Sequence, residues 1–138
     1  MRNVAAGSAA VLIVLGIFWA RPAPIADLDS KACDLLAKAG VSVELIDPRT
    51  VAPLDVETIA QSVAKTGRIL IVDEGFAPFG IGAEIAAQLA DRGFNDLDAP
   101  IYRLNGVHTP TPYSPTLEAA VVPNVEMIAQ AMRDLLAE

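Results

Sequence analysis

Four polar residues with chemically useful side chains lie at the ends of apolar runs in this 138-residue chain: Asp47, Arg49, Glu74 and His108. Carboxylates and an imidazole can transfer protons, and a guanidinium can bind anions. Parallel sheets covered by helices place such groups at strand ends. We therefore expect these four side chains in strand-end loops.

The acidic pair Asp73-Glu74 also has a structural interpretation, which we favour. An isolated acidic pair without a partner residue defines no mechanism. We expect the two carboxylates to accept backbone N–H bonds in their loop, or to pair with Arg49 or Arg68. The alternative is that Glu74 acts as a general base or contacts a ligand.

Asp47, Arg49 and His108 likewise each have a structural and a functional interpretation. Asp47 precedes Pro48, and an Asp in that position commonly stabilises its own turn, so we expect a turn or an ion pair with Arg49. His108 is either a proton carrier or a loop histidine bonded to the backbone. No Ser or Cys nucleophile with an orienting acid can be argued from spacing, so we assign no catalytic residue.

The glycines Gly75, Gly80 and Gly82 do not complete a phosphate-binding motif, because no Lys with Ser or Thr follows them. A helix that begins near Gly80 could still attract an anion. One cysteine and one histidine exclude a cysteine cage or a multi-histidine zinc site. We therefore assign no cofactor-binding or metal-binding residue, and we expect Cys33 to be a core residue on a helix face.

Composition limits the class of protein. An apolar content of 53% over 138 residues suffices for one domain with a real core. A formal net charge of −7 argues against nucleic-acid binding, which requires clustered Lys and Arg.

The apolar segment Val4 to Ala20 has three interpretations. It is short for a membrane-spanning helix, which needs about 20 residues, and it also has features of a secretory signal. We favour the interpretation that Val11 to Phe18 form a buried strand, and we then expect a cytoplasmic protein. The alternative is a protein anchored in a membrane through Val4 to Ala20. Residues 1–24 are thus this segment with a Pro-containing linker, and residues 25–138 are the remainder of a single domain.

Alternating elements are predicted along the rest of the chain. The first helix is expected from a cap at Asp27 or Asp29 to Gly40, and its apolar stripe comprises Leu28, Ala32, Leu35 and Leu36. Three more helices are expected: from Asp55 to Gly67, from Ile81 to Asp91, and after Asn124. Further strands are expected at Val41–Ile46, Ile69–Val72 and Ile101–Leu104, and no regular structure beyond a short turn between Gly106 and Pro123. This order indicates an α/β fold with a parallel sheet covered by helices.

Four stretches carry a resemblance to a known family: VELIDPRTVAPLD (43–55), KTGRILIVDEG (65–75), GAEIAA (82–87) and LDAPIYRL (97–104). Together with HTPTPYSP (108–115), they resemble the C-terminal domain of the transketolase superfamily. The likeness is strongest to the beta subunit of the decarboxylating component of pyruvate, acetoin and branched-chain 2-oxoacid dehydrogenase complexes.

The resemblance implies a three-layer α/β/α sandwich with a mostly parallel sheet of four to five strands. It also implies an assembly and regulatory domain that contributes to oxidative decarboxylation only within the full complex and is not catalytic alone. Thiamine diphosphate and Mg²⁺ would be held elsewhere in that complex. The expected partners are a second beta subunit, an alpha subunit and the acyltransferase core. The alternative is a stand-alone or membrane-anchored protein-interaction domain.

Overall fold

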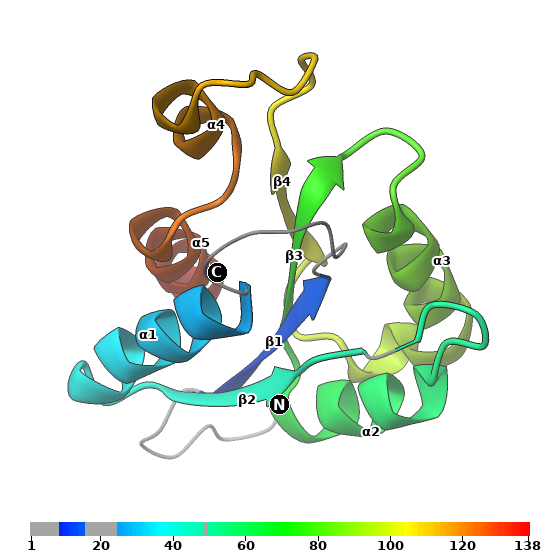
Figure 1. Ribbon diagram of the computed structural model, residues 1–138. Coiled ribbons are helices and arrows are strands. Elements are labelled where there is room, and N and C mark those ends of the chain that lie inside the picture. Colours follow the sequence, from blue (N-terminus) through cyan, green and yellow to red (C-terminus); the bar gives the residue numbers. More distant parts are fainter. Residues whose placement is uncertain (1–8, 16–24, 49) are drawn as a thin grey trace.

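The computed structural model of the chain describes residues 9–15, 25–48 and 50–138, with side chains from residue 31 onward. Strands and helices alternate over most of this part, as Figure 1 shows. In order, the elements are β1 (Ala9–Leu15), α1 (Ile25–Lys38), β2 (Ser42–Ile46), α2 (Val56–Thr66), β3 (Ile69–Phe76), α3 (Ile81–Gly93), the 3-10 turn η1 (Phe94–Asp96), β4 (Tyr102–Gly106), α4 (Pro115–Val121) and α5 (Val125–Ala137).

The four described strands form one parallel sheet in the order β2-β1-β3-β4. Strand β1 pairs on both sides, and Leu12 is in register with Leu45 of β2 and Leu70 of β3. The predicted α/β fold with four to five strands is therefore confirmed. The strand expected at 11–18 is present over residues 11–15, and residues 16–18 lie outside the described part.

The segment 4–20 is therefore a strand in its described portion, while residues 4–8 and 16–20 lie outside that portion. Within the described residues, no helix is long and apolar enough to cross a membrane.

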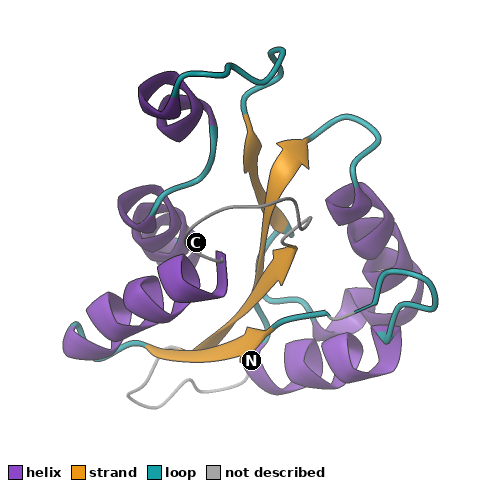
Figure 2. Ribbon diagram, in the orientation of Figure 1, coloured by secondary structure: helices purple, strands orange, loops and turns teal. Residues whose placement is uncertain are grey.

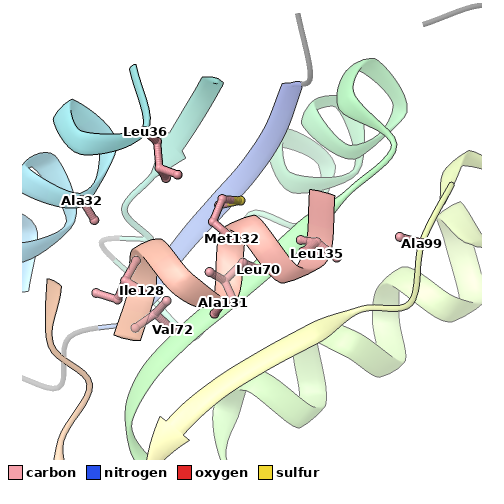
Figure 3. Close-up of a cluster of buried hydrophobic side chains, with 9 residues drawn as sticks. All are labelled: Ala32, Leu36, Leu70, Val72, Ala99, Ile128, Ala131, Met132 and Leu135. Atoms are coloured by element: carbon pink, nitrogen blue, oxygen red, sulfur yellow. The ribbon is translucent and has the colours of Figure 1, made fainter. Parts of the chain in front are cut away.

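Helices cover both faces of the sheet, as Figure 2 shows. Alternate side chains of β3 point to opposite faces, so Leu70 and Val72 meet α1 and α5, whereas Ile69 and Ile71 meet α2 and α3. The first cluster, drawn in Figure 3, comprises Ala32, Leu36, Leu70, Val72, Ala99, Ile128, Ala131, Met132 and Leu135. A strand buried on both faces must be continuously apolar, which explains the run at 69–72.

Side chains cap two helices where the sequence predicts it. The Asp55 carboxylate accepts a hydrogen bond from the Thr58 backbone N–H (3.1 Å) and a second from the Thr58 hydroxyl (2.7 Å). These bonds hold the pKa of Asp55 below its ordinary value. Asn124 likewise accepts from the Met127 N–H at 3.0 Å and starts α5. These caps fix the helix starts independently of the core.

Helix α1 differs from the prediction at its start and in its apolar stripe. It begins at Ile25, so Asp27 and Asp29 lie inside it and are not its caps. Pro24 immediately precedes the helix, and proline is compatible with a helix start. Leu35 is 45% exposed and does not belong to the buried face, which contains Ala32 and Leu36. That face is narrower than predicted because α1 packs mainly against α5 and β2.

The region expected to lack regular structure contains the short helix α4. Pro115 occupies its first turn, where a missing N–H leaves no helical bond unmade. The Glu118 N–H donates to the Ser114 carbonyl at 2.8 Å. The prediction counted prolines as helix breakers and missed that one of them can begin a helix.

Gly67 and Gly40 offer a matched test of this packing. Both have positive φ, +76° at Gly67 and +80° at Gly40, so Ala at either site should cost about 1–2 kcal/mol of unfolding free energy. A Cβ at Gly67 would also collide with the Asp98 carboxylate, whereas at Gly40 no atom lies within 4 Å. We expect Gly67→Ala to destabilise the chain by at least about 1 kcal/mol more than Gly40→Ala in urea unfolding. Adding Asp98→Ala should recover the excess, and equal losses for the two single variants would contradict this packing.

Candidate functional site

The carboxyl ends of the parallel strands meet at one edge of the sheet, and the predicted candidates are distributed along it. Asp47 directly follows β2, Glu74 lies in the last part of β3, and His108 comes two residues after β4. Strand β1 lies between β2 and β3, so Asp47 is about two strand spacings, roughly 10 Å, from β3. The structure thus brings Glu74 and His108 onto neighbouring strands and leaves Asp47 apart. Arg49 lies outside the described residues.

The acidic pair does not follow β3 but belongs to it, because the strand continues to Phe76. Pairing with β4 explains the extension: Asp73 is in register with Asn105, and Phe76 pairs with Gly106 after an irregularity. The Asn105 side-chain amide also donates to the Gly75 carbonyl at 3.2 Å. Backbone pairing therefore continues past the point where the apolar run stops.

Asp73 is a buried carboxylate, with only 1% of the residue exposed. Its Oδ1 accepts a hydrogen bond from the Gly75 N–H at 2.8 Å, as expected from the structural interpretation. Burial raises the pKa of Asp73 above its ordinary value, and the bond from Gly75 opposes that rise. The side chain thus fixes the exit of β3 at the cost of desolvating a charge.

The start of α3 lies beside this carboxylate. Asp73 Oδ2 is 3.4 Å from the position that a Cβ on Gly80 would take, and the same Cβ would collide with the Phe76 carbonyl. Gly80 is therefore needed for close approach of the loop to the helix start. A carboxylate near the helix N-terminus already supplies the negative charge favoured there. Asp73 would repel a phosphate, so this geometry disfavours the anion-binding hypothesis.

His108 contacts a residue of β3 that sequence reasoning did not consider. Its ring centroid lies 4.7 Å from that of Phe76, with the ring planes inclined by 59°. This tilted aromatic contact joins the loop after β4 to the end of β3. The side chain of His108 remains exposed. Among the described residues, no group of three or more His, Cys, Asp and Glu side chains could hold a metal ion.

The sequence did not predict two features of this edge of the sheet. The Asn105 Oδ1 is buried and has no hydrogen-bond partner. Phe79, a non-glycine residue, has φ +58° and is fully exposed. Neither feature follows from periodicity or motif spacing, and the only signal is the placement of both residues next to strand ends. Asn105 lies in β4, and Phe79 lies in the loop between β3 and α3.

Known proteins resemble this chain over most of its length. Residues 27–128 match the family described as "Transketolase, C-terminal domain". The pyruvate dehydrogenase E1 component subunit beta, mitochondrial, of Dictyostelium discoideum is 44% identical over 103 residues, covering 75% of this chain and 29% of that protein. The acetoin:2,6-dichlorophenolindophenol oxidoreductase subunit beta of Bacillus subtilis (strain 168) is 42% identical over 108 residues, covering 78% and 32%.

A solved structure shares the fold. It is described as "Split gene transketolase, inactive beta4 tetramer", with a TM-score of 0.75 and 18% identity, covering 95% of this chain and 39% of that one. At that identity, the likeness concerns the fold alone. The chain spans about a third of the length of the beta subunits that it matches.

The buried carboxylate makes the stability of the chain depend on pH. The pKa of Asp73 is higher in the folded state than its ordinary value of 3.8, so the folded state binds the proton more tightly. The contribution of Asp73 to the free energy of unfolding is therefore most favourable at low pH. Stability should fall as the pH rises from about 3.8 to the folded-state pKa, and the contribution should be constant above it.

Asp73→Asn removes this charge while keeping an oxygen for the Gly75 N–H. We expect the variant to be about 1 kcal/mol more stable than the native chain at neutral pH, with the difference shrinking towards acid. Urea unfolding at several pH values measures this, with Asp91→Asn on the exposed face of α3 as control. A pH-independent difference, or a less stable variant at neutral pH, would contradict it.

Proposed function

Because the chain belongs to the transketolase C-terminal domain family, we propose that it is the C-terminal assembly and regulatory domain of a 2-oxoacid dehydrogenase beta subunit. Such a subunit would use thiamine diphosphate, and this domain would contribute to oxidative decarboxylation only within the full complex. The observation that carries the proposal is the match at 42–45% identity to pyruvate dehydrogenase E1 and acetoin oxidoreductase beta subunits. The matched region covers only 29–32% of those proteins, so most of a beta subunit lies outside it.

The described residues do not fit thiamine diphosphate or Mg²⁺. A diphosphate at the start of α3 would face the Asp73 carboxylate, and the described part has no cluster of metal ligands. We therefore propose that other parts of the complex hold the cofactor. Asp47 and His108, in the loops after β2 and β4, and Glu74, in the last part of β3, would be structural residues.

The proposed partners are those of a beta subunit: a second beta subunit, an alpha subunit and the acyltransferase core. The relatives are themselves beta subunits, which supports association with other subunits. We propose that the chain resides in the cytoplasm together with its complex. The alternative is the mitochondrion, because some of the relatives are mitochondrial proteins.

A second candidate is a stand-alone protein-interaction domain without catalytic activity. Two fully exposed aromatic residues, Phe79 and Tyr113, favour it. An anchor through Val4–Ala20 has less support, because Ala9–Leu15 forms an interior strand of the sheet.

An activity assay tests the first part of the proposal. Purified chain given pyruvate, thiamine diphosphate, Mg²⁺ and an artificial electron acceptor should release no carbon dioxide above the protein-free rate. A complete relative, such as the Dictyostelium discoideum pyruvate dehydrogenase E1 component with pyruvate, serves as positive control. Turnover by the purified chain alone would contradict the proposal.

An association assay separates the two candidates. The acetoin oxidoreductase beta subunit of Bacillus subtilis, shortened to end before its matched region, would be mixed with this chain and analysed by size-exclusion chromatography. We expect co-elution, as for the shortened subunit mixed with its own matched region, which is the control. Co-elution of the control pair without co-elution of this chain would favour the stand-alone domain.

A further inference from the structure

Strand β4 ends in the dipeptide Asn105-Gly106, and the fold requires both residues at this point. The Asn105 side-chain amide donates to the Gly75 carbonyl of β3 at 3.2 Å. A Cβ on Gly106 would collide with the Glu74 carbonyl, so glycine allows the two strands to approach closely. Of the four asparagines in the chain, only Asn105 is followed by glycine.

An asparagine followed by glycine is chemically labile. The backbone nitrogen of the glycine attacks Cγ of the asparagine side chain and forms a new C–N bond. The bond from Cγ to the side-chain nitrogen breaks, and ammonia leaves with the proton of the attacking N–H. Water then opens the succinimide ring to aspartate or isoaspartate. Glycine favours the attack because it has no Cβ to crowd the nitrogen and adopts many backbone conformations.

Pairing with β3 protects the dipeptide. The attack requires the two reacting atoms to come within about 3–3.5 Å in an aligned geometry. The extended backbone of β4 and the bond from the Asn105 amide to the Gly75 carbonyl both oppose the rotation that would bring them together. The reaction therefore requires the end of β4 to separate from β3.

Three features make the end of β4 easy to open. Among the described residues, β4 lies at an edge of the sheet and pairs only with β3. The register of this pair shifts between Asp73 and Phe76. Asn105 Oδ1 is buried without a hydrogen-bond partner, so folding removes this oxygen from water and replaces nothing. Segments of this kind open locally at a lower free energy than global unfolding requires.

Deamidation would prevent the end of β4 from pairing again. A carboxylate at position 105 could not donate to the Gly75 carbonyl, and it would be in register with the buried carboxylate of Asp73. Like charges directly opposite each other on neighbouring strands are destabilising, and burial disfavours both charged forms. Isoaspartate would also lengthen the main chain by one methylene group and disturb the register of the strand.

We infer that Asn105-Gly106 is a site of spontaneous deamidation, which local opening of β4 exposes and whose product destabilises the β3–β4 pair. The fold thus contains a slow chemical limit on the lifetime of the native chain. This inference does not depend on the proposed function, because the reaction involves only this chain and water.

Peptide mass spectrometry tests the reaction. The purified chain would be incubated in mildly alkaline water labelled with heavy oxygen, at several urea concentrations, and then digested in ordinary water. Label at Asn105 reports succinimide hydrolysis before digestion. In fully denaturing urea, Asn105 should react at least about tenfold faster than in native buffer, because β4 no longer protects it. It should also react faster there than Asn95, the internal control, which is followed by Asp96.

The dependence on urea distinguishes local opening from global unfolding. Below the unfolding transition, the rate at Asn105 should change little with urea, because local opening exposes little surface. A rate that rises in proportion to the equilibrium constant of global unfolding would overturn the inference. Unlabelled Asn105, or equal rates at Asn105 and Asn95 in denaturing urea, would overturn it as well.

The variant Asn105→Asp tests the effect of the product. It should unfold at a lower urea concentration than the native chain at neutral pH, whereas Asn95→Asp on the exposed turn η1 should not. Asp73→Asn should raise the unfolding midpoint more in the Asn105→Asp variant than in the native chain, because it then also removes the repulsion between the two carboxylates. An unchanged midpoint for Asn105→Asp, or equal effects of Asp73→Asn in both chains, would contradict the predicted destabilisation.

Discussion

The pairing of β1 with both β2 and β3 is the interaction on which the rest of the structure depends. A parallel strand in this position needs backbone partners on both sides and helices on both faces. That requirement accounts for the apolar sequence of β1 and β3, and for the division of the helices into α1 and α5 on one face and α2 and α3 on the other. It also brings the strand ends to a common edge, where the polar and glycine residues lie.

The carboxyl edge combines a rigid interior with an exposed surface. Asp73, buried and bonded to the Gly75 N–H, fixes the exit of β3, and Gly80 allows the loop to approach the start of α3 closely. The loops that follow display Phe79 and Tyr113 to solvent. Asp73 and Asn105 thus both bond to the backbone of Gly75 at the end of β3. This use of the strand ends agrees with a domain that acts through its contacts with other parts of a complex.

Much of the fold could be predicted because it follows from local rules. Apolar runs identified the strands, and Asp55, Gly67 and Asn124 marked helix boundaries where the structure has them. The extension of β3 to Phe76 could not be predicted, since it depends on pairing with β4. Helix α4 was missed because a proline can either break or begin a helix. At the site, the sequence placed Glu74 and His108 near strand ends, but the contact of His108 with Phe76 is tertiary and leaves no sequence signal.

Amide hydrogen exchange followed by NMR tests the central claim, that β1 is an interior strand. If β1 is paired on both sides, the amides of residues 11–15 should exchange as slowly as those of β3, close to the limit set by global unfolding. Fast exchange at residues 11–15 beside slow exchange in β3 would contradict the account. The sheet would then lack its central strand, and the arrangement of the carboxyl edge described above would not hold.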